Sequence, residues 1–265
     1  MRSILAIARY TIIEQIRNRL YLIILFFGGA VLIASLLVGA LAPGHKVRVI
    51  FDLGLLALEL FGLTTAVFGA VSLVLQEIES KTIYLILTRP VSRWIYVVGR
   101  FLGLVAAVML TMVAMALLHI LVMISDPFWF KDFSMGFSFW SVYPALVFMS
   151  MMKMFVTAAI ALFFSLFATS AVSALVFTGC FWIAGHFGPE LSFMIDKALN
   201  GRAIGAVVHA VAHILPNFQY FNFRDFYAIP NFPGFEFLGT AIIYGVAYAG
   251  IFLALSSLLF ERKEF

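Results

Sequence analysis

Residues 20–41 read LYLIILFFGGAVLIASLLVGAL and contain no charged side chain. A helix needs about 20 apolar residues to cross the roughly 30 Å hydrocarbon core of a bilayer, so this stretch is long enough to span a membrane. Ala40-Leu41-Ala42 resembles a signal-peptide cleavage site. The apolar run before it is too long for a signal peptide, however, and it starts late in the chain. We therefore predict an uncleaved transmembrane helix.

The rest of the chain has the same apolar character. Of its 265 residues, 64% are hydrophobic and 11% are charged, whereas a soluble domain has about 45–50% and about 25%. A water-soluble globule of this composition would expose large apolar patches, and the high apolar content also excludes disorder. The net charge of +4 is typical of basic residues that flank membrane spans, so no nucleic-acid partner is expected. The single cysteine, Cys180, excludes an internal disulfide.

Five further stretches are long and apolar enough to cross a bilayer. The six predicted spans are residues 20–41, 53–75, 95–124, 139–167, 171–187 and 237–260. Only residues 168–170 separate the fourth span from the fifth, so these two helices must be antiparallel neighbours. The sequence predicts an all-α, polytopic membrane protein in which residues 1–265 form one transmembrane domain of six helices.

The distribution of basic residues predicts the orientation in the membrane. Six spans place both termini on one side. The segments on that side, 1–19, 76–100, 168–170 and 261–265, carry ten lysines and arginines, and the longer segments on the other side carry six. Because basic residues favour the cytoplasmic side, both termini are predicted to be cytoplasmic.

The segment before the first span has the pattern of an amphipathic helix. Its apolar side chains recur at helical spacing, and Arg9, Glu14, Arg17 and Arg19 lie on the opposite face. The apolar residues are Ile4, Leu5, Ala8, Ile12, Ile16 and Leu20. A helix of this kind is suited to the inner membrane interface, where residues 1–19 would contact lipid. The alternative is a cytoplasmic extension of the first span.

The loop at residues 76–94 is polar at its ends and apolar in the middle. Glu77 and Glu79 suit the start of a short helix, because carboxylates are favoured near a helix N-terminus. Residues 85–87 are Leu-Ile-Leu, and Arg89-Pro90 would end the helix. A purely structural loop would only need to be polar, so the apolar centre predicts that this helix fits a groove of a partner.

The residues after Pro90 are suited to the start of the third predicted span. Ser92 is placed to cap the next helix. Trp94 and Tyr96 are expected to anchor that helix at the membrane interface. Arg100 lies about one turn into the span, and we expect its long side chain to reach back to the aqueous interface.

These loop residues resemble a known pattern. Glu77 is followed by Lys81-Thr82, then Leu-Ile-Leu, then Arg89-Pro90-Val91-Ser92-Arg93, and residues 99–103 read GRFLG. This order is similar to the signature loop of type-2 ATP-binding-cassette (ABC) exporter permeases. Two positions depart from the family pattern: Lys81 replaces a common glycine, and Arg100 takes the basic position of G-K-x-x-G. The amphipathic first segment and the six spans resemble the same family.

The resemblance implies a transmembrane subunit that pairs with a second permease, either another copy or a homologue, and docks on two ABC ATPase subunits. The coupling helix of the family would lie in the loop, formed by Glu77, Glu79, Lys81, Thr82, Leu85, Leu87, Arg89, Pro90, Ser92 and Arg93. The ATPase subunits would bind ATP and Mg²⁺, and this chain would hold no cofactor and catalyse no reaction. The implied location is the cytoplasmic (inner) membrane of a prokaryote, and the implied direction is export.

The chain also lacks a nucleotide-binding motif, in agreement with a separate ATPase subunit. No G-x-x-x-x-G-K-[ST] phosphate-binding loop occurs in the chain. An ATPase that drives this protein would therefore be a separate polypeptide. The alternative function is a non-transporting membrane anchor or assembly partner of a membrane complex.

Three ionisable residues lie inside the predicted spans at similar depth. At about 1.5 Å per residue, Glu59, Lys153 and His186 lie about 21–24 Å from the cytoplasmic ends of their spans. An isolated charge at the bilayer centre costs free energy, so each of these residues is expected to have a polar partner or a functional role. One hypothesis is a polar layer in which Glu59 pairs with Lys153 and lines an outward-facing cavity. The alternative is a purely structural ion pair.

The segment at residues 188–236 is too long and too apolar for an ordinary loop. We predict re-entrant or interfacial helices, followed by an aromatic stretch suited to the headgroup level or to gating an exit. His209 and His213 are spaced i, i+4 and could share a helix face. No third ligand is indicated, so they are only weak candidates for a metal site.

Overall fold

The computed structural model describes residues 2–42, 44–79, 92–125, 139–188, 193, 215–222 and 235–262. Within these residues every regular element is helical. The long elements are α1 (Arg2–Arg17), α2 (Arg19–Ala40), α3 (Lys46–Glu79), α5 (Arg93–Ile124), α7 (Phe139–Phe167), α8 (Ala171–His186) and α11 (Phe235–Arg262), and a short 3₁₀ helix η1 (Phe218–Phe221) precedes the last.

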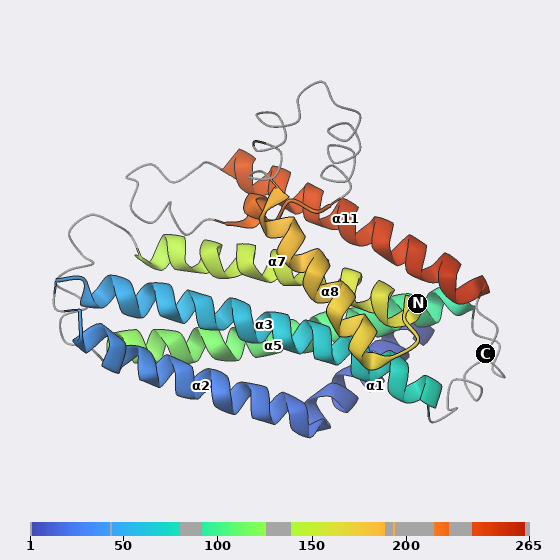
Figure 1. Ribbon diagram of the computed structural model, residues 1–265, viewed down its shortest axis with the longest axis horizontal. Helices are drawn as coiled ribbons and strands as arrows, with labels where there is room; N and C mark the ends of the chain where they lie inside the picture. Colours follow the sequence, from blue (N-terminus) through green and yellow to red (C-terminus); the bar gives the residue numbers. More distant parts are fainter. Residues whose placement is uncertain are drawn as a thin grey trace.

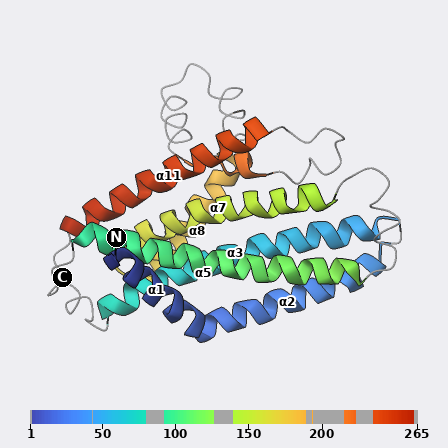
Figure 2. The same cartoon turned by 180° about the vertical axis from the view of Figure 1, so that it is seen from behind.

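Six of these helices form an antiparallel bundle (Figures 1 and 2). α2, α3, α5, α7, α8 and α11 alternate in direction, and α8 is tilted relative to α7. The short helix α1 and the last turn of α11 lie at the same end of the bundle in both views. This common end is where α3 finishes and α5 begins, which is the side predicted to be cytoplasmic.

The fold confirms the prediction of an all-α polytopic membrane protein. Among the described residues, five helices are long and apolar enough to cross a membrane, namely α2, α3, α5, α7 and α11. The helix predicted as the fifth span, α8, has 16 residues and is therefore about 24 Å long, shorter than a bilayer core. Its N-terminus is well defined, because Ser170 and Ser173 form a reciprocal capping box.

The second span was predicted too short. α3 starts at Lys46, seven residues before the predicted start at residue 53. The added turns carry Arg48 and Asp52, whose side chains form an i,i+4 ion pair of 3.6 Å at the surface. Ile50 and Phe51 lie between them in sequence and are buried in the bundle. Charge on one helix face therefore concealed an apolar face, so Glu59 lies nearer the middle of its helix than predicted.

The amphipathic helix is present, and part of its predicted apolar stripe lies on the outside of the bundle, where lipid contact was expected. α1 ends at Arg17, and Asn18 separates it from α2, so the alternative of a simple extension of the first span is wrong. The buried face of α1 consists of Ala8 together with polar Thr11 and Gln15. Leu5 and Ile16, assigned to the apolar stripe, are exposed by 67% and 38%. The inward face is polar because it meets polar groups of α3 and α5.

Candidate functional site

The predicted coupling residues that the structure describes lie at the common end of α1, α3, α5 and α11. Glu77 and Glu79 form the last turn of α3 rather than the start of a separate helix, and Ser92 and Arg93 begin α5. Lys81, Thr82, Leu85, Leu87, Arg89 and Pro90 lie outside the described residues. Ser92 is the N-cap residue, but its side chain makes no capping hydrogen bond.

Arg93 has an intramolecular role that the sequence did not indicate. Its Nη1 donates hydrogen bonds to the backbone oxygens of Phe260 at 2.9 Å and Glu261 at 2.7 Å. A cation is favoured at a helix C-terminus, where carbonyl groups lack helical partners. Arg93 therefore ties the start of α5 to the end of α11.

A buried ionic cluster joins three helices next to the predicted coupling loop. Arg100 of α5 is 2% exposed. Its guanidinium contacts Glu14 of α1 at 2.6 Å, forms an ion pair with Glu77 of α3 and donates to Thr11 Oγ1 at 3.0 Å. The Tyr96 hydroxyl donates a hydrogen bond to Glu77 as well. We call Glu14, Glu77 and Arg100 the ionic cluster.

Two glycines allow α1 to approach α5 closely enough to form the ionic cluster. A Cβ at Gly99 would lie 2.8 Å from Ile7 Cβ, and one at Gly103 would overlap Thr11 and lie 2.7 Å from the Ala8 backbone oxygen. Gly99 and Gly103 thus form a G-x-x-x-G face of the kind that permits close helix packing in membranes. Because α1 packs directly against this glycine face, the Arg100 side chain can reach Glu14.

The ionic cluster corrects two sequence predictions. Arg100 does not extend to the aqueous interface, because its charge is neutralised within the bundle by Glu14 and Glu77. Tyr96 is not an interface anchor; it is buried, and its ring stacks on Phe260 at 5.3 Å. Glu14 was missed because it was assigned to a solvated helix face. No sequence signal indicated the cluster, because the burial of Arg100 and the orientation of Glu14 depend on how α1 packs against α5.

The ionic cluster has one more acid than base. Burial, and secondly the nearby charge of Glu14, raise the pKa of Glu77 from its ordinary value to about 8. Glu77 follows the apolar span Lys46–Leu75. Two carboxylates around one guanidinium would leave a buried net negative charge if both were ionised, so the cluster favours retention of one proton at neutral pH.

This raised pKa predicts a dependence of stability on pH. Between the ordinary pKa of a glutamate and about 8, the folded protein binds a proton more tightly than the unfolded chain. The contribution of Glu77 is therefore complete at low pH and is lost as the pH rises through 8, by an amount on the order of a few kcal/mol. Thermal unfolding in detergent from pH 5 to pH 9 should show this fall. It should be smaller for Glu77→Gln, and an equal slope in the two proteins would contradict the assignment.

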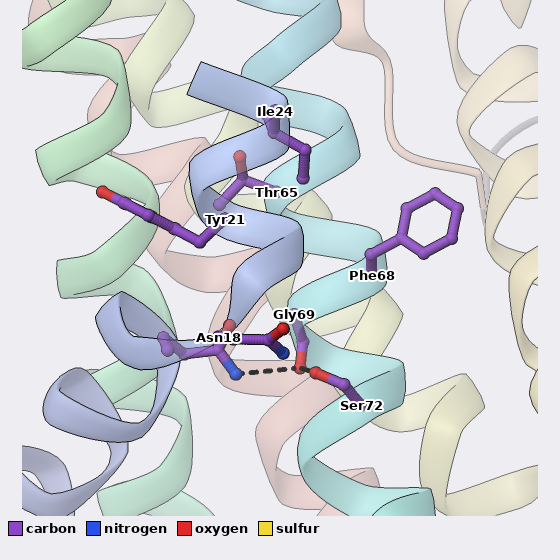
Figure 3. Close-up of a pocket in the computed structure, with 8 residues that line it drawn as sticks. Asn18, Tyr21, Ile24, Thr65, Phe68, Gly69 and Ser72 are labelled. Atoms are coloured by element: carbon purple, nitrogen blue, oxygen red, sulfur yellow. Dashed lines mark hydrogen bonds between the residues drawn. The ribbon is translucent and has the colours of Figure 1, made fainter. Parts of the chain in front are cut away.

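The elbow between α1 and α2 is a polar contact with α3 (Figure 3). Gln15 Nε2 donates to the Gly69 backbone oxygen at 3.4 Å, and Ser72 Oγ donates to the same oxygen at 3.1 Å. A cavity of about 10 Å³ lies among these groups, Asn18 and Tyr21. That volume is roughly enough for one water molecule. The turn between α1 and α2 is therefore linked to α3 by a hydrogen bond beside this small cavity.

The polar layer predicted within the membrane is also brought together. Lys153 Nζ of α7 lies 3.2 Å from Glu59 Oε2 of α3, and Ser150 Oγ donates to Glu59 Oε1 at 3.3 Å. Lys153 Nζ also lies 5.9 Å from the centre of the Trp182 ring, within reach of a cation–π interaction. The predicted Glu59–Lys153 pair is thus present in the structure.

His186 joins this layer indirectly. Its ring lies 4.0 Å from that of Trp182, and its Nδ1 is 2.9 Å from the Trp182 backbone oxygen. The weak metal candidates His209 and His213 lie outside the described residues. Among the residues that the structure does describe, no group of three or more metal-ligating side chains occurs.

A third polar contact inside the bundle was not predicted. His119 of α5 is fully buried, and its Nδ1 lies 3.1 Å from the Tyr143 hydroxyl, which donates to the Ala116 backbone oxygen at 3.2 Å. A Cβ at Gly54 of α3 would overlap the His119 ring. His119 lies within the predicted third span, so counting every ionisable residue in the spans would have identified it.

The fold defines a class: a multi-pass helical membrane protein, here with buried charged contacts at the common end of α1, α3, α5 and α11 and at one layer inside the bundle. Residues 6–265 match the family described as ABC-2 family transporter protein. The chain therefore belongs to the ABC-2 transporter family and is a permease-type membrane component, the component of such transporters that is not itself catalytic. A search among curated proteins finds no match.

Proposed function

We propose that this chain is the transmembrane subunit of an ATP-driven exporter, in which separate ATPase subunits bind ATP and Mg²⁺ and act on the loop between α3 and α5. Family membership over nearly the whole chain supports the permease role. The observation that carries the coupling proposal is the ionic cluster, which connects both ends of that loop. Glu77 lies in the turn that enters it, and Arg100 lies two turns after it.

The ionic cluster would transmit motion of the loop to several helices at once. A displacement of the α3 end moves Glu77, and Glu77 is bonded to Arg100 of α5. Arg100 in turn holds Glu14 of α1 at 2.6 Å, and Arg93 holds the end of α11. Rigid helices linked by buried, short contacts move as units. Closure of the ATPase subunits would therefore tilt α1, α3, α5 and α11 together, and a second permease subunit would complete the pathway in the inner membrane.

Charge reversal at Arg89 is the direct test of the coupling proposal. We expect Arg89→Glu to leave the permease folded, because it leaves in place every helix contact made by the described residues. It should weaken docking of the ATPase subunit or separate ATP hydrolysis from movement of the helices. The measurement is co-purification of the ATPase subunit and the ATP-hydrolysis rate of the complex in lipid vesicles. Arg93→Glu is a poor substitute, since it also breaks the hydrogen bonds to Phe260 and Glu261.

The control is Arg48→Glu, at the opposite end of α3, where the side chain is 61% exposed. It should retain normal docking and hydrolysis. If the wild-type chain purifies without any ATPase subunit, the coupling proposal is wrong and the anchor function is favoured instead. A phosphate-loop ATPase encoded beside this gene would support transport.

A further inference from the structure

A shallow hollow lies along the outer side of α1, next to the ionic cluster. It has a volume of about 400 Å³ and is lined by Tyr10, Ile13, Glu14, Arg17 and Asn18. The first four of these residues recur at i, i+3, i+4 and i+7, so they share one side of the helix. The hollow therefore follows α1 to its junction with α2 (Figure 2).

The hollow lies at the level where lipid headgroups are expected. The apolar span of α2 starts three residues after Asn18, and that of α3 ends two residues before Glu77. Glu77 and Glu14, which lines the hollow, contact the same guanidinium, that of Arg100. The two apolar spans therefore end at about the depth of the hollow. An exposed tyrosine such as Tyr10 is favoured at this boundary between lipid and water.

The hollow presents an aromatic ring, an acid and a base in order along α1. Tyr10 is 61% exposed, and the Glu14 side chain is 33% exposed although one of its oxygens contacts Arg100. Arg17 is exposed and forms no ion pair with the residues that the structure describes. Glu14 and Arg17 are nearly one helical turn apart, a rise of about 5 Å. Two opposite charges at this spacing suit a ligand that carries both.

The ionic cluster can also accept a further positive charge. Glu14 and Glu77 share the single cation of Arg100, so the cluster has one more acid than base. Glu14 is the member of the cluster that lines the hollow. An ammonium group beside it would compensate the excess negative charge. The same ammonium group would meet the ring of Tyr10, which already lies 5.4 Å from the Arg100 guanidinium.

We propose that the hollow binds the headgroup of a phospholipid that carries both a phosphate and a primary ammonium group, of the phosphatidylethanolamine class. Glu14 and Tyr10 bind the ammonium group, and Arg17 binds the phosphate, whose oxygens match a guanidinium. The bound lipid stabilises the packing of α1 at the ionic cluster. A trimethylated headgroup has no N–H to donate to Glu14, and an anionic headgroup has no cation. The proposal does not depend on transport or on the ATPase subunits.

The test measures thermal unfolding of the purified full chain in detergent micelles with added lipid. We expect phosphatidylethanolamine to raise the unfolding temperature by about 3–5 °C more than phosphatidylcholine at the same mole fraction. This is the shift for a ligand at about ten times its dissociation constant and a chain of this size. Phosphatidylglycerol should act like phosphatidylcholine. If it acts like phosphatidylethanolamine instead, the chain attracts anionic lipid in general and the proposal is wrong. An equal shift with water-soluble glycerophosphoethanolamine would show that the ligand is not a lipid.

Arg17→Gln and Arg9→Gln form a matched pair of variants. Both remove an exposed arginine from α1, but of the two only Arg17 lines the hollow. The difference between phosphatidylethanolamine and phosphatidylcholine should disappear in Arg17→Gln and remain in Arg9→Gln. If both variants keep the difference, or both lose it, the hollow is not the lipid site. Glu14→Gln is less suitable, because it also weakens the contact with Arg100.

Discussion

Replacement of Arg100 by methionine is expected to produce the largest loss of stability at the common end of α1, α3, α5 and α11. The change leaves Glu14 without its buried counterion and removes the hydrogen bonds to Thr11 and Glu77. Breaking a fully buried pair by removing one partner costs about 3–5 kcal/mol; the Glu14 side chain is 33% exposed, so we expect a loss below that range but larger than that of an exposed pair. We expect α1 to detach from α5, since Arg100 and the glycine face are its main contacts there. Thermal unfolding in detergent and protease access to α1 measure the two effects.

Two variants make this prediction specific. Arg48→Met removes an arginine from an exposed ion pair, which contributes only about 0–1 kcal/mol, so it should unfold at nearly the wild-type temperature. Arg100→Lys keeps the charge but not the planar group that reaches two carboxylates, so its stability should be intermediate. If Arg100→Met were as stable as Arg48→Met, the ionic cluster would not hold α1. The transmission route from the loop to α1 would then be wrong.

The spans were predictable because they depend on composition alone. Twenty apolar residues in succession have few alternatives to a membrane helix, and α7 begins and ends at the predicted residues. The start of α3 was not predictable by the same rule. Lys46, Arg48 and Asp52 interrupt the apolar run, and only the fold shows that Ile50 and Phe51 in the same turns are buried.

The Glu59–Lys153 pair could be predicted from the sequence, whereas the ionic cluster could not. Glu59 and Lys153 could be paired by counting residues from the helix ends, because depth along a straight helix is proportional to residue number. The ionic cluster required knowledge of which helices are neighbours and of the rotation of each about its axis. Glu14 belongs to a helix outside the spans, and its orientation depends on the packing of α1 against Gly99 and Gly103.

The segment before α11 illustrates a third limit. Composition predicted that residues 188–236 contain re-entrant or interfacial helices; of this segment the structure describes residues 193 and 215–222, and there Phe218 and Phe221 are buried against the bundle. The depth of Phe218 could not be predicted, because it depends on the absent side chain of Gly185 and on the early end of α8. A glycine near a helix end has several structural uses, and sequence alone does not distinguish them.

Removal of Lys153 is the second change with a large expected effect. In Lys153→Met, Glu59 loses its partner inside the membrane, and Trp182 loses the cation that lies on its ring. The expected loss is about 3–5 kcal/mol, measured by thermal unfolding in detergent. The double variant Glu59→Gln, Lys153→Met has no charge to compensate, so it should recover most of this stability. A double variant as unstable as the single one would show that the lysine acts by packing instead of charge.

The same double variant separates a structural ion pair from a functional one. A buried pair can often be replaced by neutral residues without loss of stability, so stability and function need not change together. If the pair is only structural, the double variant should match the wild type in both unfolding temperature and ATP hydrolysis by the assembled complex in vesicles. If the pair takes part in the transport cycle, stability returns but hydrolysis remains altered. We expect the second result, because this charged pair lies inside the bundle and is linked by the Trp182, His186 and Phe218 ring contacts to the region where α8 ends, so its loss should alter more than local packing.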